Sequence, residues 1–200
     1  MAVNRSLTLA LETAVGGGSL SILDGFTEVD FWVGNRAIFK AEDVLENIEN
    51  LLDKNRLRRS DLRLLATASE PGSATGLKIG TATALGLAKA LGIQTKSFSL
   101  FRAIETQISF AENGETVLAL PGGRSNILQR IYTRRVVETN VSLISKDAFD
   151  EYCQRVEVRK VFAHQDIITE SVALFADKFT NLGGNMAKFI GLDIARLITI

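Results

Sequence analysis

Glycine and hydroxyl residues gather in one short segment of the chain, Pro71-Gly72-Ser73-Ala74-Thr75-Gly76. The segment follows an apolar run, Leu64–Ala68, and leads into good helix formers that end at Leu91-Gly92. A strand, a Gly/Ser/Thr loop and a helix place backbone N–H groups and two hydroxyls at a helix N-terminus, where an anion such as phosphate is favoured. The spacings of a Walker A loop and of a dinucleotide-binding fingerprint are both absent. A phosphate-binding loop and a simple turn capped by Ser73 or Thr75 both fit these residues.

Metal and nucleophile chemistry have few candidate residues. The chain has one histidine, His164, and one cysteine, Cys153. His164 has no H-x-x-x-H or H-E-x-x-H partner, so we predict no metal site. We interpret His164 as a satisfied or solvent-facing side chain and Cys153 as a packed one. Ser73 lies outside a G-x-S-x-G elbow, and we assign no catalytic residue.

Net charge, hydropathy and cysteine content limit the partners and the cellular compartment that fit the chain. The 23 basic and 23 acidic residues cancel, so no whole-molecule field draws the protein to nucleic acid or membrane. No apolar stretch approaches the roughly 20 residues that span a bilayer, and the lone cysteine fits a reducing compartment. We therefore expect a cytoplasmic protein. One basic cluster could contact RNA phosphate or form the solvated end of a helix: Lys54, Arg56, Arg58, Arg59 and Arg63.

Periodicity predicts the elements that position these residues. In the first half we expect strands over 7–13, 19–23, 28–33, 64–68 and 93–97, helices over 41–54 and from the loop to 91, and a helical stripe of Phe101, Ile104, Ile108 and Ala111. After a polar turn at 112–115 we expect strands over 116–120, 127–134, 137–144 and 158–163, and helices over 147–154, 167–179 and 185–200. The order predicts an α/β fold with mixed sheets flanked by helices. We place a first lobe at residues 1–110 and a second, shortened lobe at 111–200, which echoes the first.

The loop and its helix resemble a known family signature. Pro71-Gly72-Ser73-x-Thr75-Gly76-Leu77-Lys78-Ile79-Gly80 and Ala84-x-Gly86-Leu87-Ala88 resemble the bacterial TsaB (YeaZ) family. The opening Leu9-Ala10-Leu11-Glu12-Thr13-Ala14 and the later Leu91-Gly92-Ile93 are similar to that family too. The resemblance covers about residues 6–105 and is faint beyond. It implies the two-lobed, duplicated fold of the actin/hexokinase/heat-shock ATPase superfamily (ASKHA).

The resemblance also implies a function. The chain would be a non-catalytic subunit that binds and activates a TsaD-type subunit, which makes N6-threonylcarbamoyladenosine at position 37 of tRNA. A TsaE-type ATPase would complete the set, tRNA would bind only through the complex, and the chain alone would form a homodimer.

Nucleotide-using members of the superfamily carry an acid in the first strand turn of each lobe. Glu12 holds the first place, but Pro121–Ser125 holds the second, where only Arg124 of the family pattern survives. This argues against an ATPase activity of the chain itself. If ATP or ADP with magnesium binds at the partner interface, the candidates for the phosphate loop are Glu12, Thr13, Gly72, Ser73, Thr75 and Gly76.

Small residues recur every four positions along the second helix, at Gly76, Gly80, Ala84 and Ala88. Such a ridge lets another element approach closely. Packing on the chain's own sheet fits this pattern. A partner interface made by Leu77, Gly80, Ala84 and Ala88, as the resemblance implies, fits it too.

Other functions stay open. A stand-alone ATPase or phosphotransferase would use Glu12, Ser73 and Thr75, and a metallo-glycoprotease would require bound metal. Gly183-Gly184-Asn185 could receive adenosine or simply cap a helix. The sequence also departs from the TsaB pattern at 36–40, Glu70 and Ala74, which favours a divergent scaffold over an active enzyme.

Overall fold

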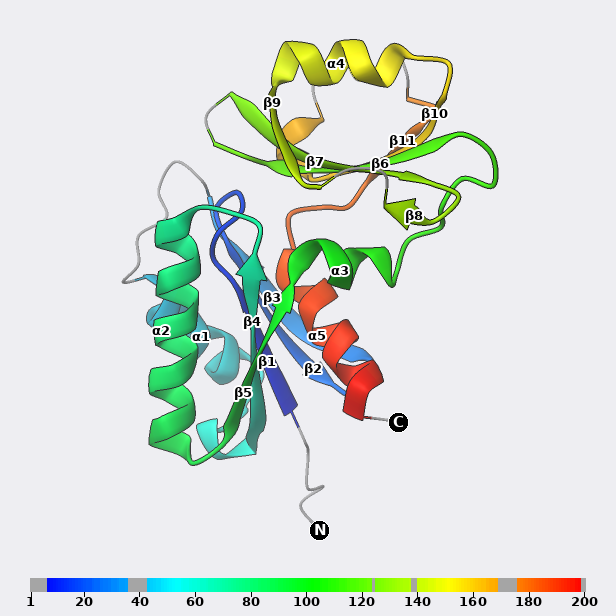
Figure 1. Ribbon diagram of the computed structural model, residues 1–200. Coiled ribbons are helices and arrows are strands. Elements are labelled where there is room, and N and C mark those ends of the chain that lie inside the picture. Colours follow the sequence, from blue (N-terminus) through cyan, green and yellow to red (C-terminus); the bar gives the residue numbers. More distant parts are fainter. Residues whose placement is uncertain (1–6, 36–42, 124, 138–139, 169–175, 199–200) are drawn as a thin grey trace. The chain divides into compact units, whose positions relative to one another are not determined.

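The structure, a computed structural model, describes residues 7–35, 43–123, 125–137, 140–168 and 176–198. The chain forms two compact units: Met1–Thr106 with Asn185–Ile200, and Gln107–Gly184. Each unit contains a mixed β-sheet with helices packed on it (Figure 1). In the described part of the chain, no helix is both long and apolar enough to cross a membrane.

The first unit is built around a strand that is buried along its whole length, β1. Its strands are β1 (Leu7–Glu12), β2 (Ser19–Asp24), β3 (Thr27–Val33), β4 (Leu62–Glu70) and β5 (Gln94–Ser99), in the spatial order β3-β2-β1-β4-β5. β1 pairs antiparallel with β2, and β2 with β3. β1 pairs parallel with β4, and β4 with β5. Because a parallel connection needs a crossover, helices must cover the sheet.

Helices cover both faces of this sheet (Figure 1). They are α1 (Asp43–Lys54), α2 (Ala74–Leu91), α3 (Leu100–Glu105) and α5 (Met186–Ile198), with a 3₁₀ turn η1 at Arg59–Asp61. Leu7, Leu9 and Leu11 of β1 pack in a core that also contains Ala84 and Ala88 of α2. On the opposite face, α5 packs on β1 and β2, and α3 packs against α5.

The second unit repeats the plan around its own central strand, β6. Its elements are β6 (Glu115–Pro121), β7 (Asn126–Thr133), β8 (Val136–Val137), β9 (Ser142–Ser145), α4 (Lys146–Gln154), β10 (Val158–Ala163), a 3₁₀ turn η2 (Gln165–Ile167) and β11 (Phe179–Asn181). The spatial order is β11-β10-β6-β7-β8, with β9 also paired to β7. Phe149 and Cys153 of α4 pack in the core with Val117 of β6, and Phe179 meets Phe149 edge to face.

Both sheets place an antiparallel hairpin on one side of the central strand and parallel strands on the other. The predicted fold class, a duplicated α/β fold with mixed sheets flanked by helices, is confirmed.

The expected division at residue 110 needs one correction, because the last helix packs with the first unit. Ile190 and Ile194 of α5 are fully buried, and α5 packs on β1 and β2. The Ala187 N–H donates to Ser19 Oγ at 2.9 Å, and Asn185 Nδ2 donates to Glu28 Oε1 at 2.7 Å. The second unit therefore ends at Gly184, and residues 185–200 complete the first.

Two predicted helices also differ from the structure. The helical stripe after residue 100 ends at Glu105, so Ile108 and Ala111 lie outside a helix. Thr106 ends it by donating from its hydroxyl to the Ala103 carbonyl oxygen at 2.9 Å. At the end of the helix predicted over 167–179, Phe179 begins strand β11, which pairs parallel with β10; residues 169–175 lie outside the described part.

The packing of α5 predicts how two substitutions on that helix will differ. Ile190→Ala should cost about 2–5 kcal/mol of unfolding free energy because it opens a cavity in a closed core. Leu197→Ala, on the same helix but 56% exposed, should change it by less than about 0.5 kcal/mol. Trp32, the single tryptophan, packs against the core of the first unit. Its fluorescence during denaturant unfolding therefore reports the unfolding of the first unit. If the Ile190→Ala protein unfolds at the same denaturant concentration as wild type, α5 does not pack in this core.

Candidate functional site

The signature loop folds back on the turn that follows β1. The Ser73 N–H donates to the Ala14 carbonyl oxygen at 2.9 Å, and Thr13 Oγ1 donates to the Gly76 carbonyl oxygen at 2.8 Å. Ser73 caps α2, since its Oγ accepts from the Gly76 N–H at 2.9 Å. The hydroxyls of Thr13 and Ser73 are thus engaged within the chain, whereas Thr75 is exposed.

The glycines of the loop are explained by this close approach. A Cβ on Gly76 would lie 2.2 Å from the Thr13 carbonyl oxygen, and a Cβ on Gly72 would lie 2.4 Å from the Ala14 Cβ. One turn further along α2, a Cβ on Gly80 would lie 2.4 Å from Thr13 Oγ1. Real Cβ atoms do not approach backbone this closely, so only glycine fits at Gly72 and Gly76. The loop in this chain is a packing device between α2 and the β1 turn.

Glu12 is fully buried at the end of β1. Its Oε1 accepts from the N–H groups of Ala14 and Val15 at 2.7 and 2.9 Å, whereas Oε2 has no hydrogen-bond partner. Burial raises the pKa of this carboxyl from 4.5 to about 8, and the two backbone bonds oppose only part of the rise. At neutral pH the group is therefore mainly protonated.

The structure brings together most of the phosphate-loop candidates but not all of them. Thr13, Gly72, Ser73 and Gly76 meet where the loop crosses the turn. Glu12 precedes Thr13, and neighbouring residues of a strand face opposite sides of the sheet. Leu7, Leu9 and Leu11 face the core under α1 and α2, so Glu12 lies on the other face. Within the loop, the Ser73 hydroxyl and the N–H groups of Ser73 and Gly76 bind the chain itself, whereas Thr75 is exposed.

The small-residue ridge faces the chain's own sheet. Gly76, Gly80, Ala84 and Ala88 are the buried residues of α2, and Ala84 is 0% exposed. Packing on β4 and β1 uses this ridge. The expectation that Gly80, Ala84 and Ala88 form a partner interface is therefore corrected: of the four residues named for it, only Leu77 retains partial exposure.

His164 and Cys153 are both structural. Nδ1 of His164, which is buried, accepts from the Asp166 N–H at 3.1 Å and caps η2. Cys153 is buried in the second core, and burial raises the pKa of its thiol to about 12, so it is not an activated nucleophile. Among the described residues, no group of three His, Cys, Asp or Glu side chains is placed to hold a metal ion.

The segment Gly183-Gly184-Asn185, considered above as a possible adenosine site, lies at the start of a helix. Asn185 immediately precedes α5 and its Oδ1 accepts from the Lys188 N–H at 3.2 Å, and Gly183 adopts a left-handed backbone two residues earlier. The segment thus follows strand β11 and caps a helix start, not a helix end. Arg124 and residues 36–40 lie outside the described part of the chain.

One charged feature of the second unit was missed by sequence reasoning. An open cleft of about 800 Å³ is lined by Arg134, Arg135, Arg159 and Lys160, together with the segment 109–113. Two adjacent basic pairs about 25 residues apart are ordinary surface residues in a sequence, and only strand pairing brings them together. One feature of the sequence could have drawn attention to them. Arg134 and Arg135 occupy a short hairpin turn, where asparagine or glycine is usual.

The two sheets, built on one plan, define an actin-like α/β protein, and comparisons with known proteins agree. YeaZ from Pseudomonas aeruginosa is 18% identical with a TM-score of 0.59, over 97% of this chain and 93% of that chain. A second structure from Pseudomonas aeruginosa, a protein with similarity to peptidase YeaZ, is 15% identical with a TM-score of 0.60 over the same shares. The family model of TsaD, tRNA N6-adenosine threonylcarbamoyltransferase, matches residues 40–198. The chain belongs to this family.

These findings confirm the resemblance read from the signature, and the family match extends it well beyond residue 105. No curated protein sequence matches the chain.

The buried carboxyl of Glu12 predicts a pH-dependent stability. Below pH 4.5 the Glu12 carboxyl is protonated in both the folded and unfolded states, so the protein has the full stability that the protonated carboxyl allows. As pH rises toward about 8 only the unfolded chain loses the proton, so stability falls, by about 1.4 kcal/mol for each unit of the pKa difference. Glu12→Gln keeps the oxygen that accepts both N–H bonds and cannot ionise. Relative to wild type, its melting temperature should therefore rise steadily between about pH 5 and about pH 8; a pH-independent difference would contradict the protonated state.

The ridge predicts opposite outcomes for two neighbouring residues of α2. Ala84→Arg buries an unpaired charge against β4, so its melting temperature should fall sharply or the protein should become insoluble. Leu85→Arg adds the same side chain at a position 55% exposed and should melt close to wild type. A thermal melt of both variants is the measurement, and a stable Ala84→Arg protein would show that the ridge does not face the sheet.

Proposed function

We propose that this chain is a non-catalytic partner subunit for N6-threonylcarbamoyladenosine modification of tRNA, which binds and activates a TsaD-type subunit. Membership of a tRNA N6-adenosine threonylcarbamoyltransferase family supports the pathway. The TsaB-like signature and the full-length likeness to YeaZ support the partner role over the transferase role.

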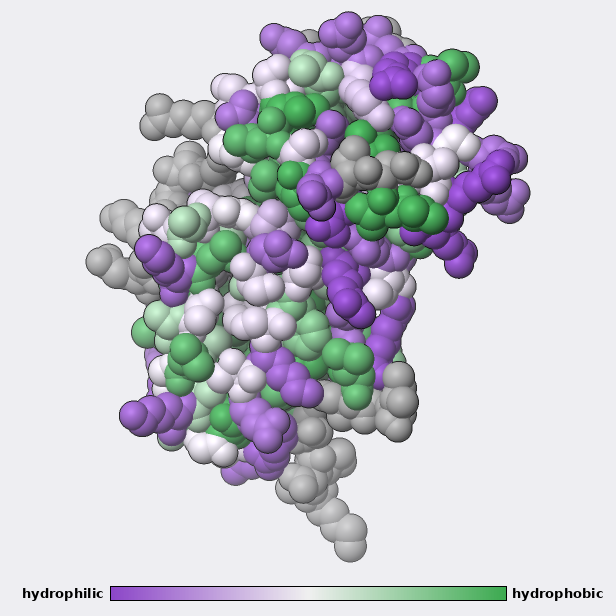
Figure 2. Space-filling model, in the orientation of Figure 1, coloured by the Kyte–Doolittle hydropathy of each residue, from purple (hydrophilic) through white to green (hydrophobic). Residues whose placement is uncertain are grey.

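The outer face of α2 is the observation that carries the proposal. Only two of its 18 residues are charged, Lys78 and Lys89, although the helix lies on the surface. Leu85 is exposed, and a Cβ on the neighbouring Gly86 would meet nothing within 4 Å. Figure 2 shows this helix as a mostly white and green surface at the left of the view. A surface helix whose exposed face holds only two charges, beside an exposed leucine and small residues, is expected to bury part of that face against another protein.

Gly86 supports the same interpretation. Glycine in the middle of a helix costs roughly 0.5–1 kcal/mol relative to alanine. Gly80 has a reason inside the chain, because its Cβ would clash with Thr13. Gly86 has none, and a helix without a side chain there allows a partner helix to approach closely. The interface we propose therefore consists of exposed residues of α2, with Ala82, Leu85 and Gly86 at its centre and the half-buried Leu77 at its edge.

The candidate site supports a scaffold more than an enzyme. Glu12 is mainly protonated and buried at neutral pH, and the signature loop is closed on its own chain. The chain would act by ordering its partner, with any nucleotide held mainly by the partner's residues. In the absence of that partner, a second copy of the chain would cover the same face.

Leu85→Arg tests the interface directly, because it leaves the fold intact while placing a charge where the partner would bury it. In size-exclusion chromatography with the TsaD-type protein of the same organism, wild type should co-elute and Leu85→Arg should not. Burying an unpaired charge in the interface costs more than about 1.4 kcal/mol, the free energy that corresponds to a tenfold change in affinity. The affinity of the variant for the TsaD-type protein should therefore fall more than tenfold.

Leu143→Arg is the matched control, a leucine 56% exposed on β9 of the second unit. It should co-elute like wild type. If wild type fails to bind the TsaD-type protein, the proposed function is wrong; if Leu85→Arg binds as well as Leu143→Arg, the partner uses another surface.

A further inference from the structure

The hairpin between β7 and β8 contains two arginines in an unfavourable backbone conformation. Thr133 pairs with Val136, so Arg134 and Arg135 form a two-residue turn, with φ of 50° and 70°. Both positions of such a turn normally take Asn or Gly, because a Cβ is disfavoured in the left-handed region. Asn-Gly would be more stable than Arg-Arg in this turn. The stability of the turn therefore does not explain why arginines occupy it.

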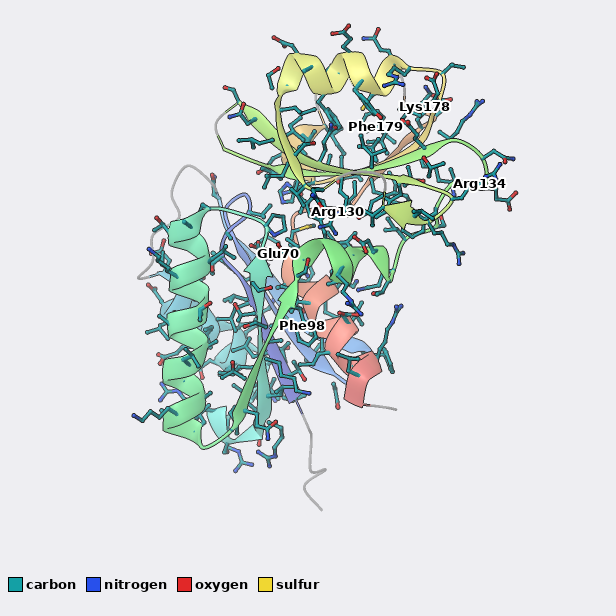
Figure 3. All side chains as sticks on the ribbon, in the orientation of Figure 1. Glu70, Phe98, Arg130, Arg134, Lys178 and Phe179 are labelled. Atoms are coloured by element: carbon teal, nitrogen blue, oxygen red, sulfur yellow. The ribbon has the colours of Figure 1, made fainter. Side chains whose placement is uncertain are left out.

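These arginines line the cleft of the second unit together with two basic residues of β10, Arg159 and Lys160. Figure 3 shows Arg134 at the end of β7, and Figure 2 shows hydrophilic side chains gathered along the same edge. Glu112 is the one acid that lines the cleft. The described lining residues therefore carry a net positive charge, although the chain as a whole is neutral.

The second pair of cations is held in place by the surrounding backbone. Lys160 Nζ donates to the carbonyl oxygen and the hydroxyl of Ser109 at 3.1 and 3.2 Å, which ties the segment before β6 to β10. A Cβ on Gly114 would lie 2.7 Å from Arg159 Cγ, so the glycine makes room for the arginine stem. Glu157, the acid two residues before Arg159, pairs with Arg155 at 3.5 Å.

The basic cluster of the first unit provides a contrast. Lys54 pairs with Asp30 at 2.8 Å, Arg58 pairs with Asp61 at 3.0 Å, and Arg59 pairs with Glu49. These cations are neutralised locally, which fits a solvated helix end. Among the described ion pairs, none involves Arg134, Arg135 or Arg159, although the charge of Arg159 contributes to the lowered pKa of Glu157.

We propose that the cleft of the second unit binds the phosphate backbone of an RNA strand. Guanidinium groups match phosphate oxygens bidentately, and several cations along one cleft suit successive phosphates better than a single one. The half-buried Phe110 in the cleft wall offers a ring for a base to stack on. The inference goes beyond the proposed function, because it gives this chain an RNA contact of its own, made by residues of the second unit and not by α2.

The turn itself supplies the sharpest test. Arg134→Asn with Arg135→Gly removes both charges and installs the residues that the turn conformation favours. The melting temperature should stay the same or rise, while binding to a fluorescein-labelled tRNA anticodon stem-loop, followed by anisotropy, should weaken at least tenfold at low salt. The slope of log K against log salt should become shallower by about 1.4, for two phosphate contacts at about 0.7 each.

Arg58→Ala with Arg59→Ala is the control, since it removes the same charge from adjacent exposed arginines of the first unit. It should bind the stem-loop like wild type. Equal affinity of the turn variant and wild type, equal losses in both double variants, or wild-type binding of inorganic tripolyphosphate without the stem-loop would each overturn the proposal. Co-elution with the TsaD-type protein should survive the turn variant, so failure here and failure of the proposed function are distinguishable.

Discussion

The close approach of α2 to the turn after β1 is the constraint on which the first unit depends. Backbone at Gly72 and Gly76 touches backbone at Thr13 and Ala14, with distances that leave no room for a Cβ. The same contact aligns the small residues of α2 over β4 and β1, where they complete the core. A short Gly/Ser/Thr motif thus sets the position of an 18-residue helix, whose exposed face includes Leu85 and Gly86.

This constraint also separates groups that a nucleotide-binding site would need together. Thr13 and Ser73 direct their hydroxyls to the chain itself, and the carboxyl of Glu12 lies on the other face of the sheet without access to solvent. The fold keeps the plan of an actin-like protein while its signature loop serves packing. The functional surfaces we propose, the outer face of α2 and the basic cleft, lie on elements that the packing leaves exposed.

Local patterns predicted much of the fold, because the strands and helices of both units carry clear periodicity and caps such as Ser73 and Gly92. They could not predict that residues 185–200 complete the first unit, since the amphipathic pattern of α5 shows that it packs but not on which sheet. The ridge of Gly80, Ala84 and Ala88 was equally ambiguous between a sheet and a partner. The cleft was missed because strand pairing, not sequence spacing, joins Arg134 and Arg135 to Arg159. Of the candidate site, the cap by Ser73 was among the predictions, whereas the contacts of the loop with Thr13 and Ala14 and the burial of Glu12 were not.

ATP turnover by the chain alone tests the central claim, that the signature loop is closed for packing and does not serve catalysis. With magnesium and saturating ATP, phosphate release measured on the purified protein should not exceed that of buffer. Sustained hydrolysis by wild type that is abolished by Glu12→Ala would contradict the account, because it would require an ionised Glu12 and an open loop in the working protein.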